Sequence, residues 1–235
     1  MPYGRNTTKF SEGIYSTFGV SSKDELFKYI DNNGLTKRFK RIHFHNSSRT
    51  IEEFRSQLNL SKEFIEKYKS IDKINLGGDL LSLYNYGRVK FLKELLEIKK
   101  ASIFSNINFI FEPGEALIKY GGMLLTTVLN IKEEKNYCNV FLDSSKWVSA
   151  PWYTGKPILL ESESNNNKFK YCLYGNTMFP YDNYFSTPVF LPKLEEGDRL
   201  LLPEFGAYTL SNFRSFHLIN KPNEYILSNN ELKRI

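Results

Sequence analysis

The spacing of hydrophobic residues changes near residue 121 and divides the chain into two regions. Before that point, short apolar runs alternate with longer stretches in which apolar residues recur every three or four positions. This alternation predicts β-strands connected by helices. After it, short β-like runs follow one another with turn-rich segments between them. We therefore expect an α/β region over 1–121 and a β domain over 122–235.

Three strands are predicted in the first region, over 39–45, 74–78 and 107–111. Thr50 and Glu53 have the spacing of a capping box, which predicts a helix beginning there. A second long helix is predicted from Leu80 to about Lys100. The apolar residues on these two helices are Ile51, Phe54 and Leu58 on the first, and Val89, Leu92, Leu95, Leu96 and Ile98 on the second.

The strands of the first region end at regular intervals. Their last residues are His45, Gly78 and Glu112, which are 33 and 34 residues apart. This is the length of one βα unit, so the strands should be parallel neighbours joined by crossover helices. Their carboxyl ends would then meet at one rim, which is where α/β barrels bind ligands.

The second region is expected to be a mainly antiparallel β domain, because no long helical stripe interrupts its strands. Its predicted strands cover 123–131, 136–142, 157–161, 169–174 and 199–202.

Composition and charge exclude several classes of protein. The chain has 235 residues, of which 41% are hydrophobic and 25% charged, which suits one large or two modest globular domains. The net charge of +6 is spread along the chain, so a nucleic-acid partner is not expected. No apolar stretch approaches the roughly 18 residues of a membrane span, and no signal peptide is recognisable. Cys138 and Cys172 lie in apolar runs; they could be bridged, but two buried free thiols in a cytoplasmic protein are expected.

His43 and His45 lie on the same face of their predicted strand, because side chains in a strand repeat every two residues. Two such histidines could hold a metal ion, or could be ordinary structural residues. No third His or Cys stands nearby, since the only other histidine is His217. A metal site is therefore not expected. Gly77 and Gly78, at a strand end before a helix, would allow close approach of a phosphate or form a tight turn.

Several short motifs, in order along the chain, match one family. They are STFGV at 16–20, HFHNSS at 43–48, INLGGD at 74–79, EPGEA at 112–116, GNTM at 175–178 with Asp182, LEEGD at 194–198 and GAYT at 206–209. In these motifs and in their order, the chain resembles the C-terminal portion of the fold-type-III amino-acid decarboxylases that depend on pyridoxal 5′-phosphate (PLP). The family includes ornithine, diaminopimelate and carboxynorspermidine decarboxylases.

The resemblance implies a fold and a set of roles. The first region would be the last four or so βα units of a (β/α)8 alanine-racemase-like barrel. The second would be an antiparallel β-barrel or sandwich that serves dimerisation and substrate-side contacts, its last segment returning to the barrel. His45 would stack on the pyridine ring and Glu112 would pair with the ring nitrogen. Ser48, the backbone of Gly77 and Gly78, and Tyr208 would hold the phosphate.

The resemblance also places residues near the substrate. Met178 occupies the position of the family's catalytic cysteine, and Asp182 lies in the same segment, which the family uses to complete the active site of a dimer mate. The partners implied are a small amino-acid substrate and a second copy, or a complementing chain that carries the N-terminal half-barrel.

Some residues depart from the family pattern. No motif for the lysine that binds PLP covalently is present, the third glycine of the phosphate loop is Asp79, and the arginine after EPG is Glu115. Two hypotheses follow. The chain is the C-terminal part of a split or truncated decarboxylase of basic or diamino acids, inactive alone, or it is a non-catalytic homologue that binds partners or is degenerate.

Overall fold

The computed structural model describes residues 19–20, 22–45, 50–160 and 167–235. The chain divides into two compact units, Met1–Ala116 and Leu117–Ile235, which we call the first and second units. Each unit has its own hydrophobic core. Within the described residues, no helix is long and apolar enough to cross a membrane.

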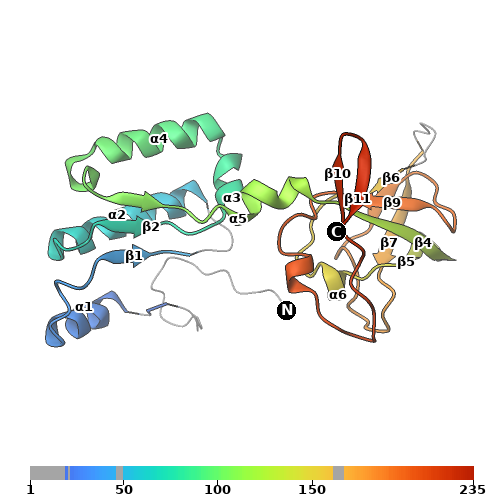
Figure 1. The fold of residues 1–235 in the computed structure, drawn as a ribbon, viewed down its shortest axis with the longest axis horizontal. Coiled ribbons are helices and arrows are strands. Elements are labelled where there is room, and N and C mark those ends of the chain that lie inside the picture. The colour runs from blue at the N-terminus through green and yellow to red at the C-terminus, as the bar shows by residue number, and fades with distance from the viewer. Residues whose placement is uncertain (1–18, 21, 46–49, 161–166) are drawn as a thin grey trace. The chain divides into compact units, whose positions relative to one another are not determined.

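The first unit consists of a small parallel sheet and helices (Figure 1). Its elements in chain order are α1 (Lys23–Asn32), β1 (Arg41–His43), α2 (Ile51–Lys67), β2 (Lys73–Asn75), α3 (Leu80–Asn85), α4 (Arg88–Lys100), the 3-10 turn η1 (Ser102–Phe104), β3 (Asn108–Ile110) and α5 (Gly114–Ile118), which continues into the second unit. The sheet order is β1-β2-β3, and both neighbouring pairs are parallel. The parallel arrangement expected from the spacing of the strands is thereby confirmed.

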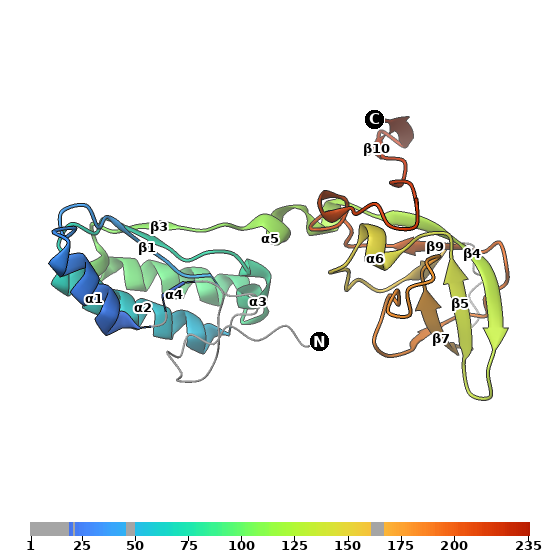
Figure 2. The same cartoon turned by 90° about the horizontal axis from the view of Figure 1, so that it is seen from below.

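The helices α1, α2, α3 and α4 lie on one side of the sheet of the first unit (Figure 2). Ile42 and Ile74 are buried toward them, in the same core as Phe54, Leu58 and Phe91. Because side chains alternate along a strand, the other face carries a different set of residues. In register across the three strands, this uncovered face carries Arg41, Lys73 and Asn108, followed by His43, Asn75 and Ile110.

The start of α2 was predicted correctly. The Thr50 hydroxyl accepts a hydrogen bond from the Glu53 backbone N–H at 3.1 Å, and the Glu53 carboxylate accepts one from the Thr50 N–H at 2.9 Å. This reciprocal capping box fixes the helix where the polypeptide leaves the carboxyl end of β1.

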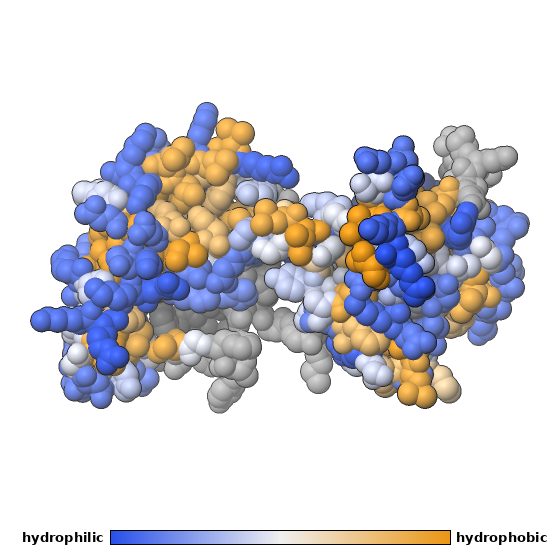
Figure 3. Space-filling view, viewed as in Figure 1, coloured by the Kyte–Doolittle hydropathy of each residue, from blue (hydrophilic) through white to orange (hydrophobic). Residues whose placement is uncertain are grey.

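The single helix predicted from Leu80 to Lys100 is wrong, because the chain breaks it into α3 and α4 at Tyr86 and Gly87. Gly87 has φ +113°, a conformation that glycine adopts without strain. In α4 the residues against the core are Phe91, Leu95 and Ile98. Val89, Leu92 and Leu96 are more than half exposed, and apolar side chains gather over α4 in Figure 3.

The second unit is built on a six-stranded sheet in the order β6-β9-β4-β5-β7-β8. The unit contains η2 (Lys119–Gly121), β4 (Leu124–Glu133), β5 (Cys138–Leu142), α6 (Lys146–Ser149), β6 (Ile158–Leu159), β7 (Phe169–Tyr174), β8 (Val189–Leu191), β9 (Arg199–Leu202), η3 (Leu210–Asn212), β10 (Tyr225–Ser228) and β11 (Glu231–Arg234). All pairings are antiparallel except β5 with β7, so the mainly antiparallel domain is confirmed. Cys138 and Cys172 are free as expected, but they are half-buried rather than buried.

The last two strands form a separate antiparallel hairpin, β10-β11, in which every residue is exposed. The sequence patterns did not predict this hairpin or β8. The return of the last segment to the barrel, which the resemblance implied, stays a prediction.

Candidate functional site

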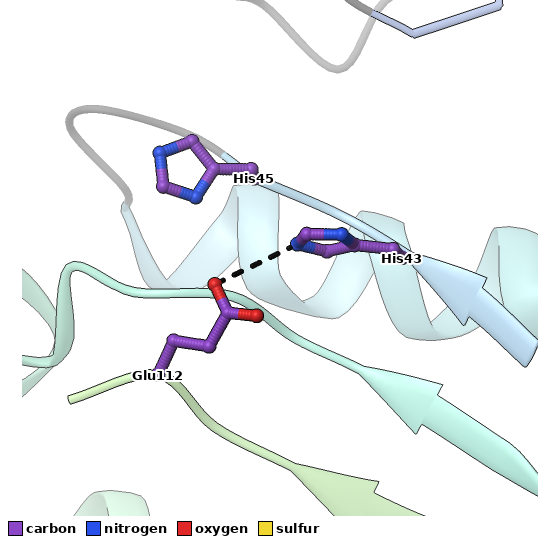
Figure 4. Close-up of side chains that lie close together, drawn as sticks. All are labelled: His43, His45 and Glu112. Carbon is purple, nitrogen blue, oxygen red and sulfur yellow. Dashed lines mark ion pairs between the residues drawn. The ribbon is translucent and has the colours of Figure 1, made fainter.

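Two imidazoles and a carboxylate lie together at the carboxyl ends of β1 and β3 (Figure 4). One nitrogen from His43, one from His45 and one carboxylate oxygen of Glu112 all lie within 4.8 Å of one another. His43 Nε2 and Glu112 Oε2 are 3.8 Å apart, and both side chains are 49% exposed. The two histidine rings stand nearly perpendicular, with centroids 6.3 Å apart.

The register of the sheet explains why these residues meet. His43 pairs with Asn75, and Asn75 pairs with Ile110. His45 and Glu112 each follow two residues later on their own segments, so both continue along the same uncovered face. The Glu112 backbone N–H donates to the Gly77 carbonyl at 2.9 Å, which holds the end of the third strand against the middle one.

Gly77 and Gly78 leave space between the two outer segments. A Cβ at Gly77 would lie 2.3 Å from the Phe44 carbonyl oxygen, and Gly77 has φ +67°. A Cβ at Gly78 would lie 3.1 Å from the Glu112 carbonyl oxygen and 3.9 Å from His45 Cε1. A larger residue at Gly77 would therefore clash with the backbone of Phe44 and would be strained at this positive φ, so close approach and backbone conformation both require glycine here.

Asn75 is a site residue that the sequence patterns missed. Its side-chain amide donates to Glu112 Oε1 at 2.8 Å, and its oxygen accepts the Gly77 backbone N–H at 2.9 Å. The side chain is buried, so these bonds fix both the carboxylate and the glycine turn. An asparagine two residues before a glycine is a turn signal, and that signal could have indicated it.

Asp79, at the third glycine position of the family pattern, keeps the backbone conformation that a glycine would adopt. It has φ +59°, in the left-handed region, and its carboxylate accepts a hydrogen bond from the Ser82 hydroxyl at 2.7 Å. Asparagine and aspartate tolerate this region better than most residues. Asp79 can therefore replace the glycine of the family pattern while the loop keeps its backbone conformation. Ser48, the other predicted phosphate contact, lies outside the described residues.

The remaining predicted site residues belong to the second unit. Tyr208 is about half exposed and packs edge-on against Trp152, with ring centroids 6.1 Å apart. Met178 is 90% exposed, and its backbone N–H donates to His217 Nδ1 at 3.4 Å.

Asp182, by contrast, is buried at 2% exposure. Its carboxylate accepts hydrogen bonds from the Ser145 hydroxyl, the Trp147 N–H and the Thr177 hydroxyl at 2.8, 2.9 and 2.6 Å. Nearby, burial lowers the pKa of Lys146, while the charge of Asp182 opposes that shift. This geometry ties Asp182 to its own unit.

The fold and the cluster together define a class of protein. The polar residues stand at the carboxyl ends of parallel strands, which is where open α/β sheets and α/β barrels bind small ligands. The chain is an α/β unit, with a polar rim at the carboxyl ends of its parallel strands, joined to a mainly antiparallel β unit.

Within this class, the chain resembles PLP-dependent amino-acid decarboxylases. No protein-family model matches it. Diaminopimelate decarboxylase of Helicobacter pylori is 24% identical over 230 residues, which cover 93% of this chain and 56% of that protein. The chain thus spans about half the length of the curated relatives that it matches.

Solved structures agree with that resemblance. Carboxynorspermidine decarboxylase complexed with norspermidine from Campylobacter jejuni matches with a TM-score of 0.70 and 26% identity, over 96% of this chain and 64% of that one. A structure of SrLDC in complex with PLP and cadaverine matches with a TM-score of 0.68 and 18% identity, over 87% of this chain and 56% of that one. The resemblance stated from the sequence is confirmed.

Proposed function

We propose that this chain is the C-terminal part of a cytoplasmic PLP-dependent decarboxylase acting on a basic or diamino acid. The lysine that binds the cofactor would come from outside these 235 residues, on a preceding segment or on a second chain. On this proposal, 1–121 form the last βα units of an alanine-racemase-like barrel. Residues 122–235 form the β domain used for dimerisation and substrate-side contacts.

One observation carries the proposal: a carboxylate and an imidazole face the space beside a glycine turn at the rim of the sheet. Glu112 Oε1 is held by Asn75, and Glu112 Oε2 lies on the side of the histidines. A fixed carboxylate suits a protonated pyridine nitrogen, and a neighbouring imidazole can stack on the ring. The residues present therefore fit the aromatic part of PLP.

We assign His45 to the face of the pyridine ring and Glu112 to its nitrogen. Glu112 would keep a proton at that nitrogen by accepting a hydrogen bond from it. The bound cofactor supplies an electron sink for the carbanion that decarboxylation leaves.

The phosphate would be held by Ser48, the backbone of Gly78 and the hydroxyl of Tyr208. The N–H of Gly77 already donates to Asn75. Gly77 would therefore contribute to the phosphate site mainly by allowing the backbone to approach closely. Met178 and its segment, anchored by Asp182, would face the active site of a partner copy.

The second candidate function is a non-catalytic homologue, and two observations favour it. Met178 stands where the family has a cysteine, and a thioether has no proton to donate. Asp79 adds a negative charge beside the glycine turn, where a phosphate would be bound. Such a protein would bind partners without decarboxylating an amino acid.

The test is to produce the chain together with a segment or reading frame that carries the lysine motif, and to purify the complex. We expect the complex to take up PLP and to show the visible absorbance of a cofactor joined to lysine. It should then release carbon dioxide from a basic or diamino acid in a panel of lysine, ornithine, arginine and diaminopimelate. If no complex takes up PLP, the enzyme proposal is wrong.

The Glu112→Gln variant tests the assigned role within that complex. We expect weaker retention of PLP and a loss of activity of about 10²-fold or more, because the carboxylate no longer keeps the ring nitrogen protonated. Glu66→Gln, on the exposed face of α2, removes a carboxylate far from the rim and is the matched control. Equal behaviour of the two variants would contradict the role of Glu112.

A further inference from the structure

We propose that His43, His45 and Glu112 form a binding site for a divalent transition-metal ion of the zinc type. The sequence argument against a metal site counted only His and Cys as third ligands, and Glu112 stands 67 residues beyond His45. The sheet brings this carboxylate to the two imidazoles. Two histidines and one carboxylate form a recognised ligand set for zinc and for non-haem iron.

The distances suit a metal after small side-chain movements. Two ligand atoms at about 2.1 Å from a tetrahedral zinc ion lie about 3.4 Å apart. His43 Nε2 and Glu112 Oε2 are already 3.8 Å apart, and all three ligand atoms lie within 4.8 Å of one another. Rotation of the exposed imidazoles about their side-chain bonds can close the remaining gap, and the backbone need not move.

The backbone holds the three ligands on one side of the sheet. The two histidines come from the same face of a single segment, and Glu112 comes from the segment on the far side of the middle one. Level with His45 and Glu112 the middle segment has glycines, Gly77 and Gly78, which add no side chain there, while Asn75, level with His43, contributes the amide that bonds Glu112 Oε1. All three ligands are exposed, which leaves room for water as a fourth ligand.

Asn75 supplies the supporting contact that metal sites usually have around their ligands. Its amide bond to Glu112 Oε1 orients the carboxylate and leaves Oε2 on the side of His43. Outer contacts of this kind contribute about 10- to 100-fold in metal affinity. Arg41 and Lys73 lie on the same face two residues earlier in their strands, so their positive charges reduce the affinity.

The metal site and the proposed cofactor site share His45 and Glu112, whereas His43 belongs to the metal site alone. If the proposed function is correct, metal and PLP must compete. That consequence rests on the proposed function, but metal binding itself does not, because it needs neither PLP nor the lysine. The two proposals can therefore fail separately.

The experiment measures Zn²⁺ binding to the untagged chain by titration calorimetry, without PLP, in a background with both Cys138 and Cys172 changed to Ala. The thiols are removed because they are themselves zinc ligands. We expect one ion per chain. Co²⁺ bound at the same site should give the visible absorbance typical of four-coordinate, tetrahedral Co²⁺. His43→Gln, His45→Gln and Glu112→Gln should each weaken binding by at least about tenfold.

His217→Gln is the matched control, because it removes the third and last histidine of the chain from a position in the second unit. It should leave the affinity and the stoichiometry unchanged. Unchanged binding in His43→Gln, with far-UV circular dichroism showing that the variant is folded, would overturn the metal site. So would a loss of binding in His217→Gln.

Addition of PLP to the zinc-loaded chain separates the two proposals. A loss of apparent zinc affinity greater than the chelation of Zn²⁺ by free PLP accounts for supports shared use of His45 and Glu112. If PLP binds while the zinc affinity of the wild type stays the same, the cofactor assignment of these two residues is contradicted and the metal site still stands.

Discussion

Asp182 shows how a single buried carboxylate can organise a loop. It joins the residues around Ser145, Trp147 and Thr177 through hydrogen bonds, and a Cβ at Gly175 would lie 2.2 Å from its Oδ2. The Ser145 hydroxyl, the Trp147 N–H and the Thr177 hydroxyl all donate hydrogen bonds to this carboxylate. The residue is therefore best understood as the anchor that positions the exposed segment containing Met178.

Replacement of Asp182 by Asn should destabilise the second unit by about 1–3 kcal/mol. The new amide group would face hydrogen-bond donors and leave at least one buried polar group unsatisfied. Chemical denaturation followed by tryptophan fluorescence measures this loss. Glu133→Gln, at an exposed position on β4, should stay within about 0.5 kcal/mol of wild type.

At the residue scale, the sequence could indicate the rim but not its internal bonding. The regular spacing of His45, Gly78 and Glu112 was enough to predict that they meet, because parallel βα units repeat at that length. The roles of Asn75 and His43 depend on side-chain contacts across strands, and these depend on register. No pattern along the chain encodes such contacts directly.

At the element scale, α2 and α4 are linked by an ion pair with two hydrogen bonds. Arg55 donates from Nε to Glu94 Oε1 at 2.6 Å and from Nη2 to Glu94 Oε2 at 2.9 Å. The Arg55 guanidinium lowers the pKa of Glu94 below its ordinary value, although burial opposes this shift. The folded protein therefore favours the charged form of Glu94.

This shift predicts a loss of stability in acid. A carboxylate with a lowered pKa in the folded state contributes stability above its unfolded pKa of about 4.3, and the contribution is lost as the pH falls through the lower folded value. Urea midpoints should therefore be higher for wild type than for Glu94→Gln at pH 7, and the difference should shrink toward pH 3. A difference that stays constant with pH would contradict the link.

The elements that the sequence predicted well are those with strong local signals. The capping box placed the start of α2, and strong apolar runs placed β1, β2 and β3 to within a few residues. The break between α3 and α4 was missed, because one glycine within a periodic stretch is compatible with a continuous helix. The hairpin β10-β11 was missed because it has no buried face to give it a pattern.

At the scale of the whole molecule, the two units have separate cores and separate spectroscopic probes. The sequence contains two tryptophans, Trp147 and Trp152, and both lie in the second unit. The long helices α1, α2 and α4 all lie in the first unit. Tryptophan fluorescence therefore reports on the second unit, and helical circular dichroism reports mainly on the first.

Phe54→Ala should lower the stability of the first unit alone. Phe54 is fully buried, with its ring centroid 5.2 Å from that of Phe91, and removing such a side chain typically costs about 3–5 kcal/mol. The helical transition should move to lower denaturant while the fluorescence transition stays in place. Val140→Ala, in the core of the second unit, should do the reverse. Equal shifts of both probes in either variant would show that the units unfold as one.

The division into two units was visible in the sequence, because the period of the apolar residues changes with the type of element. The predicted boundary near residue 121 lies a few residues beyond the division at Ala116. The difference arises because α5 and η2 carry no strong pattern and connect the two units.

The parallel sheet of the first unit has two edge strands, β1 and β3, in the part of the chain that the structure describes. Among the described residues, β1 and β3 each pair only with β2, so each presents an edge of backbone N–H and C=O groups. Strands supplied by another chain would close these edges, and the free energy of that association would add to the stability of the unit. By mass action, the folded fraction would then rise with the concentration of the supplying chain. On the proposal that a second chain supplies these strands, the ratio in which the two chains are made would set how much of this protein is folded and resists proteolysis.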